Sequence, residues 1–146
     1  MATNYTQSST KPPFIKAKTG VQSDAVSVTA ADSAGDMSPG FIPVNASIVS
    51  AVSGNIHYVI TLPAYVAGTV IIMAVAAICE LRAPVISGQP TSINGTAVDN
   101  GSAQTKELAL AASTVYQCIA MGSFNWAITA IAGNGAVSAG GTPNAV

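Results

Sequence analysis

The chain has 146 residues, a formal net charge of −1 and only 8% charged side chains, against about 25% in typical soluble domains. This length suits a single domain, because domains commonly contain about 100–150 residues. The small net charge creates no long-range field for a polyanion, and the three lysines near the N-terminus, Lys11, Lys16 and Lys18, are too few for a nucleic-acid footprint. The composition therefore argues against nucleic acid as a partner. It predicts an outer surface of small neutral residues, which packs against neighbouring copies.

Residues 1–43 are predicted to form an extended N-terminal arm. This region is polar and is interrupted by prolines and glycines, which break regular elements. Within it, the alternation of Ala25–Thr29 predicts a short strand that can join a sheet edge, its own or that of another subunit.

Short strands separated by turn residues are predicted for residues 44–132, the β-domain. Asn94-Gly95 and Asn100-Gly101 are typical of tight turns, because both pairs supply residues that tolerate a positive φ. The pattern favours an all-β fold, an antiparallel β-sandwich or a jelly-roll-like barrel. Residues 133–146, rich in Gly, Ala and Asn, are predicted to form a C-terminal tail, either a loose strap or a disordered end.

Two hairpins are predicted from alternating side chains. Residues 48–52 and 56–62 alternate on either side of a Ser-Gly-Asn turn and predict the first hairpin. Residues 115–121 and 124–130 alternate on either side of Gly122-Ser123 and predict the second.

The apolar run Ala64–Cys79 is shorter than the roughly 20 residues that a membrane-spanning helix needs. Its centre is rich in β-branched residues, so we expect a central strand over residues 69–78, buried on both faces, and no membrane association. Residues 81–86 predict a further strand interrupted by Pro84, and residues 106–112 a helical turn.

The sequence offers few side chains for catalysis. Its single histidine, His57, falls within a predicted strand, where a structural imidazole is expected. The six acidic residues are scattered, and no pair with the arrangement of a two-carboxylate active site is evident. Glu80 and Arg82 are two apart on a strand and therefore share a face, which predicts an ion pair or a contact with a neighbour. We expect no enzymatic activity and no catalytic residues.

Neither a metal site nor a cofactor site is predicted. Cys79, Cys118 and His57 match no zinc-binding spacing, and no glycine-rich phosphate loop is present. Both cysteines fall in apolar runs, so buried thiols are expected, although a disulfide between them remains an alternative. The aromatic residues of Phe124-Asn125-Trp126 are expected in the core, although a carbohydrate platform is the alternative.

The stretch from Tyr58 to Ile131 resembles a β-rich module of tailed-phage virion proteins, which include fibres, spikes and head decorations. The resemblance lies in the order of its motifs, and it departs from the common pattern where an acidic Asp-Gly-x-x-Trp is more usual. The matching motifs, in chain order, are Ile60-Thr61-Leu62-Pro63-Ala64, the apolar strand from Gly68 to Ile78, Ile93-Asn94-Gly95-Thr96, Leu108-Ala109-Leu110-Ala111-Ala112, Tyr116-Gln117-Cys118 and Gly122-Ser123-Phe124-Asn125-Trp126.

This resemblance implies a homotrimeric β-structure that binds or braces, with no catalytic residues. We expect a capsid decoration or cement protein on the virion surface, in which a trimeric knob is joined to an arm that clamps neighbouring major capsid subunits. Strands from residues 25–29 or 44–52 would complete a neighbour's sheet, and Val70 and Ile72 would help to fill the domain or trimer core. The residues expected at the assembly interface are Phe14, Ile15, Val26, Val28, Phe41, Ile42, Tyr58, Glu80, Arg82 and Trp126.

Two alternatives remain at this stage. The first is a tail fibre, spike or neck component that binds a host receptor, although the chain is short for a fibre. The second is a small enzyme or ligand-binding barrel, for which no convergent set of polar groups is evident.

Overall fold

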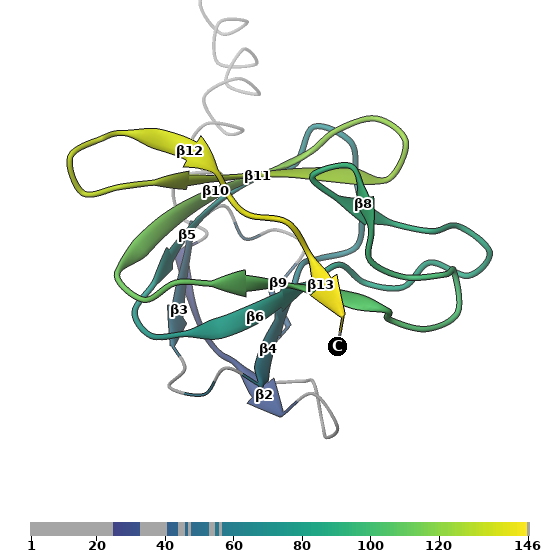
Figure 1. Cartoon of the computed structure of the whole chain (residues 1–146), viewed down its shortest axis with the longest axis horizontal. Helices are drawn as coiled ribbons and strands as arrows, with labels where there is room; N and C mark the ends of the chain where they lie inside the picture. The colour runs from purple at the N-terminus through teal and green to yellow at the C-terminus, as the bar shows by residue number, and fades with distance from the viewer. Residues whose placement is uncertain are drawn as a thin grey trace, which may run out of the picture.

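The computed structural model describes residues 25–32, 41–43, 46, 48–52, 55 and 57–145, and these residues form strands without any helix (Figure 1). The predicted all-β class is confirmed. Most of the predicted arm, including Phe14 and Ile15, lies outside the described residues. The strands are β1 (Ala25–Thr29), β2 (Ala31–Asp32), β3 (Ile48–Val52), β4 (Tyr58–Thr61), β5 (Val70–Val75), β6 (Cys79–Arg82), β7 (Ser92–Ile93), β8 (Thr96–Ala97), β9 (Lys106–Leu110), β10 (Thr114–Ala120), β11 (Asn125–Ile131), β12 (Val137–Ala139) and β13 (Asn144–Ala145).

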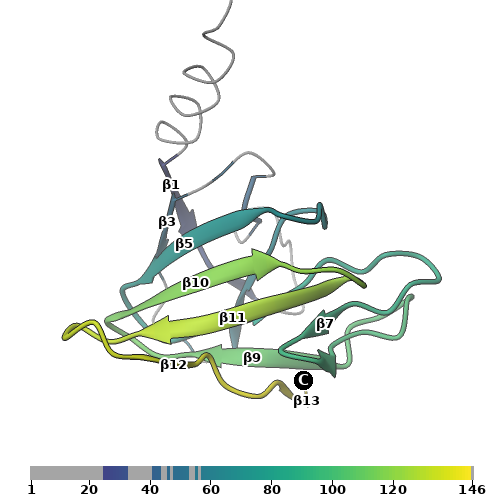
Figure 2. The same ribbon diagram turned by 90° about the horizontal axis from the view of Figure 1, so that it is seen from above.

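The strands form two sheets that pack face to face. The larger has eight strands in the order β1-β3-β5-β10-β11-β7-β8, with β12 also paired to β11. Figure 2 looks onto this sheet and shows β1, β3, β5, β10 and β11 side by side. The smaller sheet has five strands in the order β13-β9-β6-β4-β2. Apolar side chains from both sheets fill the space between them, as in a β-sandwich.

Both sheets are mixed, whereas the sequence predicted antiparallel sheets. The chain alternates between the sheets along β3, β4, β5 and β6, so β3 lies parallel to β5 and β4 lies parallel to β6. The pairs β1–β3 and β7–β11 are also parallel. The predicted first hairpin is therefore wrong, because β3 and β4 belong to different sheets. Turn residues at 53–55 predict that the chain changes direction, but not which strand it pairs with next.

The second predicted hairpin is confirmed by β10 and β11. They pair antiparallel from Val115 with Ile131 to Ala120 with Trp126. Tyr116 and Cys118 face the core, and the residues between them face the other way, which agrees with the predicted alternation and with the predicted burial of Cys118. The tight turn between β7 and β8 is also as predicted, with Asn94 at φ 51° and Gly95 at φ 77°.

Three other predicted elements need correction. Residues 106–110 form strand β9 instead of a helical turn, because Leu108 and Leu110 alternate into the core. Strand β5 is central, but only one of its faces is fully buried, since Val70 and Ala74 are exposed. Strand β6 ends at Arg82, before Pro84, which cannot donate a backbone hydrogen bond.

The C-terminal tail forms a strap between the two sheets. Strand β12 pairs with β11 of the larger sheet, and β13 pairs with β9 of the smaller one. Between them, the Gly140 amide donates to the carbonyl of Ile128 at 3.0 Å. A Cβ at Gly140 would lie 2.7 Å from that carbonyl oxygen, so only glycine fits without displacing the strap.

Candidate assembly surfaces

Four of the residues predicted at the assembly interface are buried within the chain itself. Val28, Ile42 and Trp126 belong to the core cluster, and the exposed fraction of Trp126 is 0%. Arg82 is buried on the opposite face of the smaller sheet. In the described structure these four residues stabilise the domain from within.

The other predicted interface residues are more accessible. Phe41 is 45% exposed and Tyr58 is 36% exposed. Val26 is partly buried against the core, and Glu80 is half-buried. Strands β1 and β3, which were expected to complete a neighbour's sheet, pair with each other instead, and β3 also pairs with β5.

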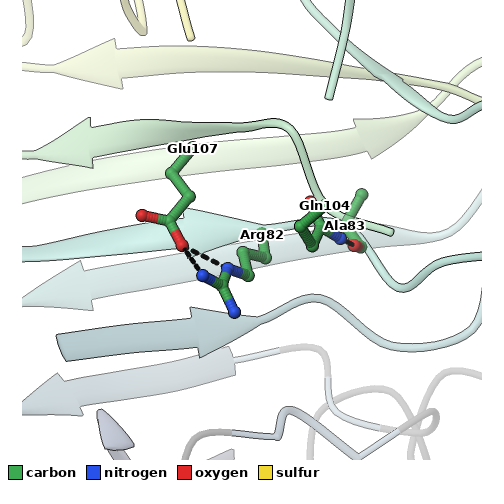
Figure 3. Close-up of polar contacts among 4 residues, drawn as sticks. All are labelled: Arg82, Ala83, Gln104 and Glu107. Atoms are coloured by element: carbon green, nitrogen blue, oxygen red, sulfur yellow. Dashed lines mark hydrogen bonds and ion pairs between the residues drawn. The ribbon is translucent and has the colours of Figure 1, made fainter. Parts of the chain in front are cut away.

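An ion pair joins strands β6 and β9 of the smaller sheet. Leu81 and Leu108 are paired and face the core, so Arg82 and Glu107 lie on the other face of the sheet, where both side chains are also buried. The Nε and Nη2 groups of Arg82 both contact Oε1 of Glu107 (Figure 3). The predicted partner, Glu80, is attracted to Arg82 by charge, while Arg82 forms its direct ion pair with Glu107. The sequence signal for this partner was the alternation of β9, which the helical interpretation of residues 106–112 obscured.

Glu80 completes this polar cluster, and its pKa is raised to about 7. Burial of the carboxyl group is the largest cause, followed by a side-chain hydrogen bond with Glu107 and repulsion from that carboxylate, while Arg82 opposes the shift. A proton on Glu80 allows it to donate to Glu107, which also accepts from Arg82. The three side chains therefore interact with one another on the smaller sheet.

A second buried carboxylate, that of Asp99, is held by hydrogen bonds within a loop. Its side chain accepts hydrogen bonds from the Thr91 amide at 3.0 Å, from the Thr91 hydroxyl and from the Gly101 amide at 2.7 Å. These contacts tie together the two ends of the segment that contains β7 and β8. Backbone donors occupy both of its carboxylate oxygens, as expected for a group that fixes a loop.

An aromatic cluster lies at the turn between β10 and β11. The ring of Tyr65 is 5.2 Å from that of Phe124 and 6.0 Å from that of Trp126, measured between centroids. Ser123 and Phe124 in the turn both have positive φ, at 60° and 53°. Because Trp126 is fully buried, its face offers no carbohydrate platform, and the predicted core role is the one observed.

The cysteines are free and buried, as expected from their apolar surroundings. Burial raises the pKa of the Cys79 thiol to about 11, with a smaller contribution from Glu80, and burial raises that of Cys118 to about 12. Among the described residues, no group of three or more His, Cys, Asp or Glu side chains is arranged to hold a metal ion. That part of the chain also has no helix with the length and hydropathy of a membrane span.

The outward face of the larger sheet carries no charged residue among those described on its strands β3, β5, β10, β11 and β12. We call this surface the uncharged face. Its side chains are exposed or half-buried, and they alternate with the core residues of the same strands. The uncharged face consists of Ser50, Val70, Ile72, Ala74, Val115, Gln117, Ile119, Ala127, Thr129, Ile131, Val137 and Ala139.

Charge is therefore concentrated on the smaller sheet and in the loops of the described structure, while the larger sheet presents a neutral surface. An extended surface without charge is a candidate for contact with another protein surface. The chain's own residues are the basis for assigning a function, because no protein-family model, no curated protein and no solved structure matches it.

Proposed function

We propose that this chain is a structural protein of a tailed-phage virion, a capsid decoration or cement protein. Its β-domain forms a homotrimeric knob on the capsid surface, and residues 1–24, which precede its first strand, run across the shell to clamp neighbouring major capsid subunits. The protein acts by binding and bracing, without catalysis and without a cofactor.

The observation that carries this proposal is the exposure of large apolar side chains on a chain with very few charges. Covering such side chains with other subunits removes apolar surface from water, which favours association. The large hydrophobic residues that are at least 36% exposed in the described structure are Phe41, Tyr58, Val66, Val70, Ile78, Val85, Met121 and Val137.

The contacts that the charged residues make within the domain also support a structural role. Glu80, Arg82 and Glu107 interact with one another, and Asp99 is held by Thr91 and Gly101. A catalytic carboxylate needs access to a substrate proton. Groups engaged in this way are suited to fixing strands and loops in place.

The position of β1 supports the clamping role of the N-terminal segment. Strand β1 is the outermost strand of the larger sheet, and Figure 2 shows it at the edge. Residues 1–24 therefore join the domain at an edge, from which a segment can extend toward a neighbouring subunit. The resemblance of the motif order in the sequence to that of virion modules agrees with this proposal.

The proposal is tested by adding the purified protein to heads of the encoding phage that lack it. Saturable binding that raises the temperature at which the heads break supports the proposal. The variant Phe14→Ser/Ile15→Ser should remain trimeric but lose affinity for heads, whereas the matched control Ser8→Ala/Ser9→Ala should bind normally. Binding to host cells but not to heads would overturn the proposal in favour of a receptor-binding tail component.

A further inference from the structure

We infer that the uncharged face of the larger sheet is the surface through which copies of this chain contact one another. This inference rests on the proposed function, because it assigns the trimer contact to a specific surface. The occupant of the face is a second copy of the same chain.

The lack of charge on this face makes it suitable for burial. A charged side chain loses several kcal/mol of hydration when it is buried without compensation, whereas apolar and small hydroxyl side chains lose far less. Residues such as Gln117 and Thr129 can still form neutral hydrogen bonds across a contact. The corresponding face of the smaller sheet differs, since it holds the half-buried Glu80 beside Arg82 and Glu107, which are already buried within the chain and paired with each other.

The size of the face is adequate for a specific contact. Neighbouring strands lie about 4.8 Å apart and rise about 3.3 Å per residue, so five strands over about six residues present roughly 500 Å² per copy. In a trimer each copy divides this face between two neighbours, so each contact covers roughly 500 Å² in total and the three contacts together roughly 1,500 Å². A face of roughly 500 Å² is also as large as the largest apolar patches of monomeric proteins, which are often functional.

The arrangement of large and small side chains makes the face complementary to itself. The rows across the sheet follow from the register: Ser50, Ala74, Val115, Ile131 and Val137 are neighbours in one row. In this row the small residues lie toward β3 and the large ones toward β12. The contact therefore needs the β3 end of one copy to meet the β12 end of the next.

The next two rows along the strands have the opposite order, with large residues on β5 and small ones on β11. Val70 shares a row with Ile119 and Ala127, and Ile72 lies in the row of Thr129. When the β3–β5 half of one face meets the β11–β12 half of another, each large side chain therefore lies opposite a small one. The opposed pairs are Val70 with Ala127, Ile72 with Thr129, Ala74 with Ile131 and Ser50 with Val137.

A threefold axis roughly parallel to β10 produces this arrangement in every contact. Each copy then offers its β3–β5 half to one neighbour and its β11–β12 half to the other, which closes the ring. The same pairs of residues would also form about a twofold axis. The residue pairs therefore identify the contact face but not the number of copies in the oligomer, which must be measured separately.

The first experiment compares two identical substitutions at exposed alanines. Ala74 lies within the uncharged face, and Ala103 lies in the loop between β8 and β9. Ala74→Lys should raise the dissociation constant of the oligomer at least about 100-fold by sedimentation, while Ala103→Lys should leave it unchanged. Fluorescence of the buried Trp126 verifies that each variant is folded. Association of Ala74→Lys with the wild-type dissociation constant would overturn the inference.

The second experiment captures the contact covalently, without relying on loss of association. The variant Ser50→Cys/Val137→Cys is oxidised with glutathione disulfide and separated under denaturing conditions. Within one copy, the two positions are four strands apart, about 19 Å, which is too far for a disulfide. The native cysteines are buried, so they do not interfere. The single variants serve as matched controls and should give no covalent trimer.

The outcomes separate this inference from the proposed function. A covalent trimer supports both the face and the trimeric knob. A covalent species no larger than a dimer supports the face and overturns the trimer. An oligomer of wild-type protein that gives no crosslink in the double variant overturns the face but leaves the knob. Adsorption of the wild-type monomer to phosphatidylcholine vesicles in place of self-association overturns the inference.

Discussion

Arg82 and Glu107 form a buried ion pair across strands β6 and β9, although 25 residues separate them in the chain. Figure 3 shows the guanidinium and the carboxylate meeting on adjacent strands, and Gln104 bonding to the carbonyl of Ala83 nearby. The pair lies on the outward face of the smaller sheet, with Glu80 beside it. Most of the few charges in the described structure are thus used to hold the domain together.

Removing one member of this pair should be strongly destabilising. Glu107→Ala leaves Arg82 buried without its main counter-ion, and we expect the free energy of unfolding to fall by about 3 kcal/mol in urea denaturation. Lys106→Ala on the same strand is the control, with an expected change within about 0.5 kcal/mol. A loss below about 1 kcal/mol for Glu107→Ala would contradict the structural role of the pair.

The raised pKa of Glu80 predicts a stability that depends on pH. Its folded-state pKa of about 7 lies above the ordinary value of 4.5, so between these values the folded protein holds a proton that the unfolded chain has released. The free energy of unfolding therefore decreases as the pH rises from about 4.5 to about 7. Glu80→Gln should flatten this slope and be more stable than wild type at pH 8.

The control for this titration is the sequence's only histidine, His57, which is exposed. Histidine is the other residue type that commonly titrates near neutral pH. His57→Gln should retain the slope if Glu80 causes it. A slope that survives in Glu80→Gln and disappears in His57→Gln would show that the carboxyl group is not responsible.

The packing of the C-terminal strap is tested by a pair of Gly→Ala substitutions. Gly140→Ala places a methyl group 2.7 Å from the Ile128 carbonyl oxygen, so the strap must move away from β11, and we expect a loss of at least about 2 kcal/mol. Gly133→Ala meets nothing within 4 Å and should be nearly neutral. Hydrogen exchange at residues 137–145 should accelerate only in Gly140→Ala. Equal exchange in both variants would mean that the strap is not packed as described.

The turn between β10 and β11 should gain stability from glycine. Ser123 has φ 60°, a conformation that costs an L-residue roughly 1 kcal/mol relative to glycine. Ser123→Gly should therefore raise the free energy of unfolding by about 0.5–1 kcal/mol in thermal denaturation. Ser123→Ala keeps the Cβ and should show no such gain; an equal gain in both variants would attribute the effect to loss of the hydroxyl group.

The sequence predicted local elements better than long-range pairing. The β10–β11 hairpin was evident because both arms alternate without interruption on either side of a short turn. The parallel pair β3–β5 was not evident, because another strand of the opposite sheet intervenes in the chain. A period of two in the side chains identifies a strand and its buried face, but it carries no information about which strand lies beside it.

The candidate surfaces were predicted less well, for a similar reason. Residues 106–112 are rich in Leu and Ala, which favour helices, so the strand that contributes Glu107 was missed. Trp126 and Val28 were expected at an interface, but apolar residues in a strand do not reveal whether they face the domain's own core. The uncharged face became visible only when the register of β3, β5, β10, β11 and β12 aligned its rows.

A cryo-electron microscopy reconstruction of the phage head tests the central claim most directly. We expect three copies of the domain around a threefold axis on the outer capsid surface, with their uncharged faces toward that axis and residues 1–24 extending over neighbouring capsid subunits. A reconstruction in which this chain is absent from the head would contradict the account.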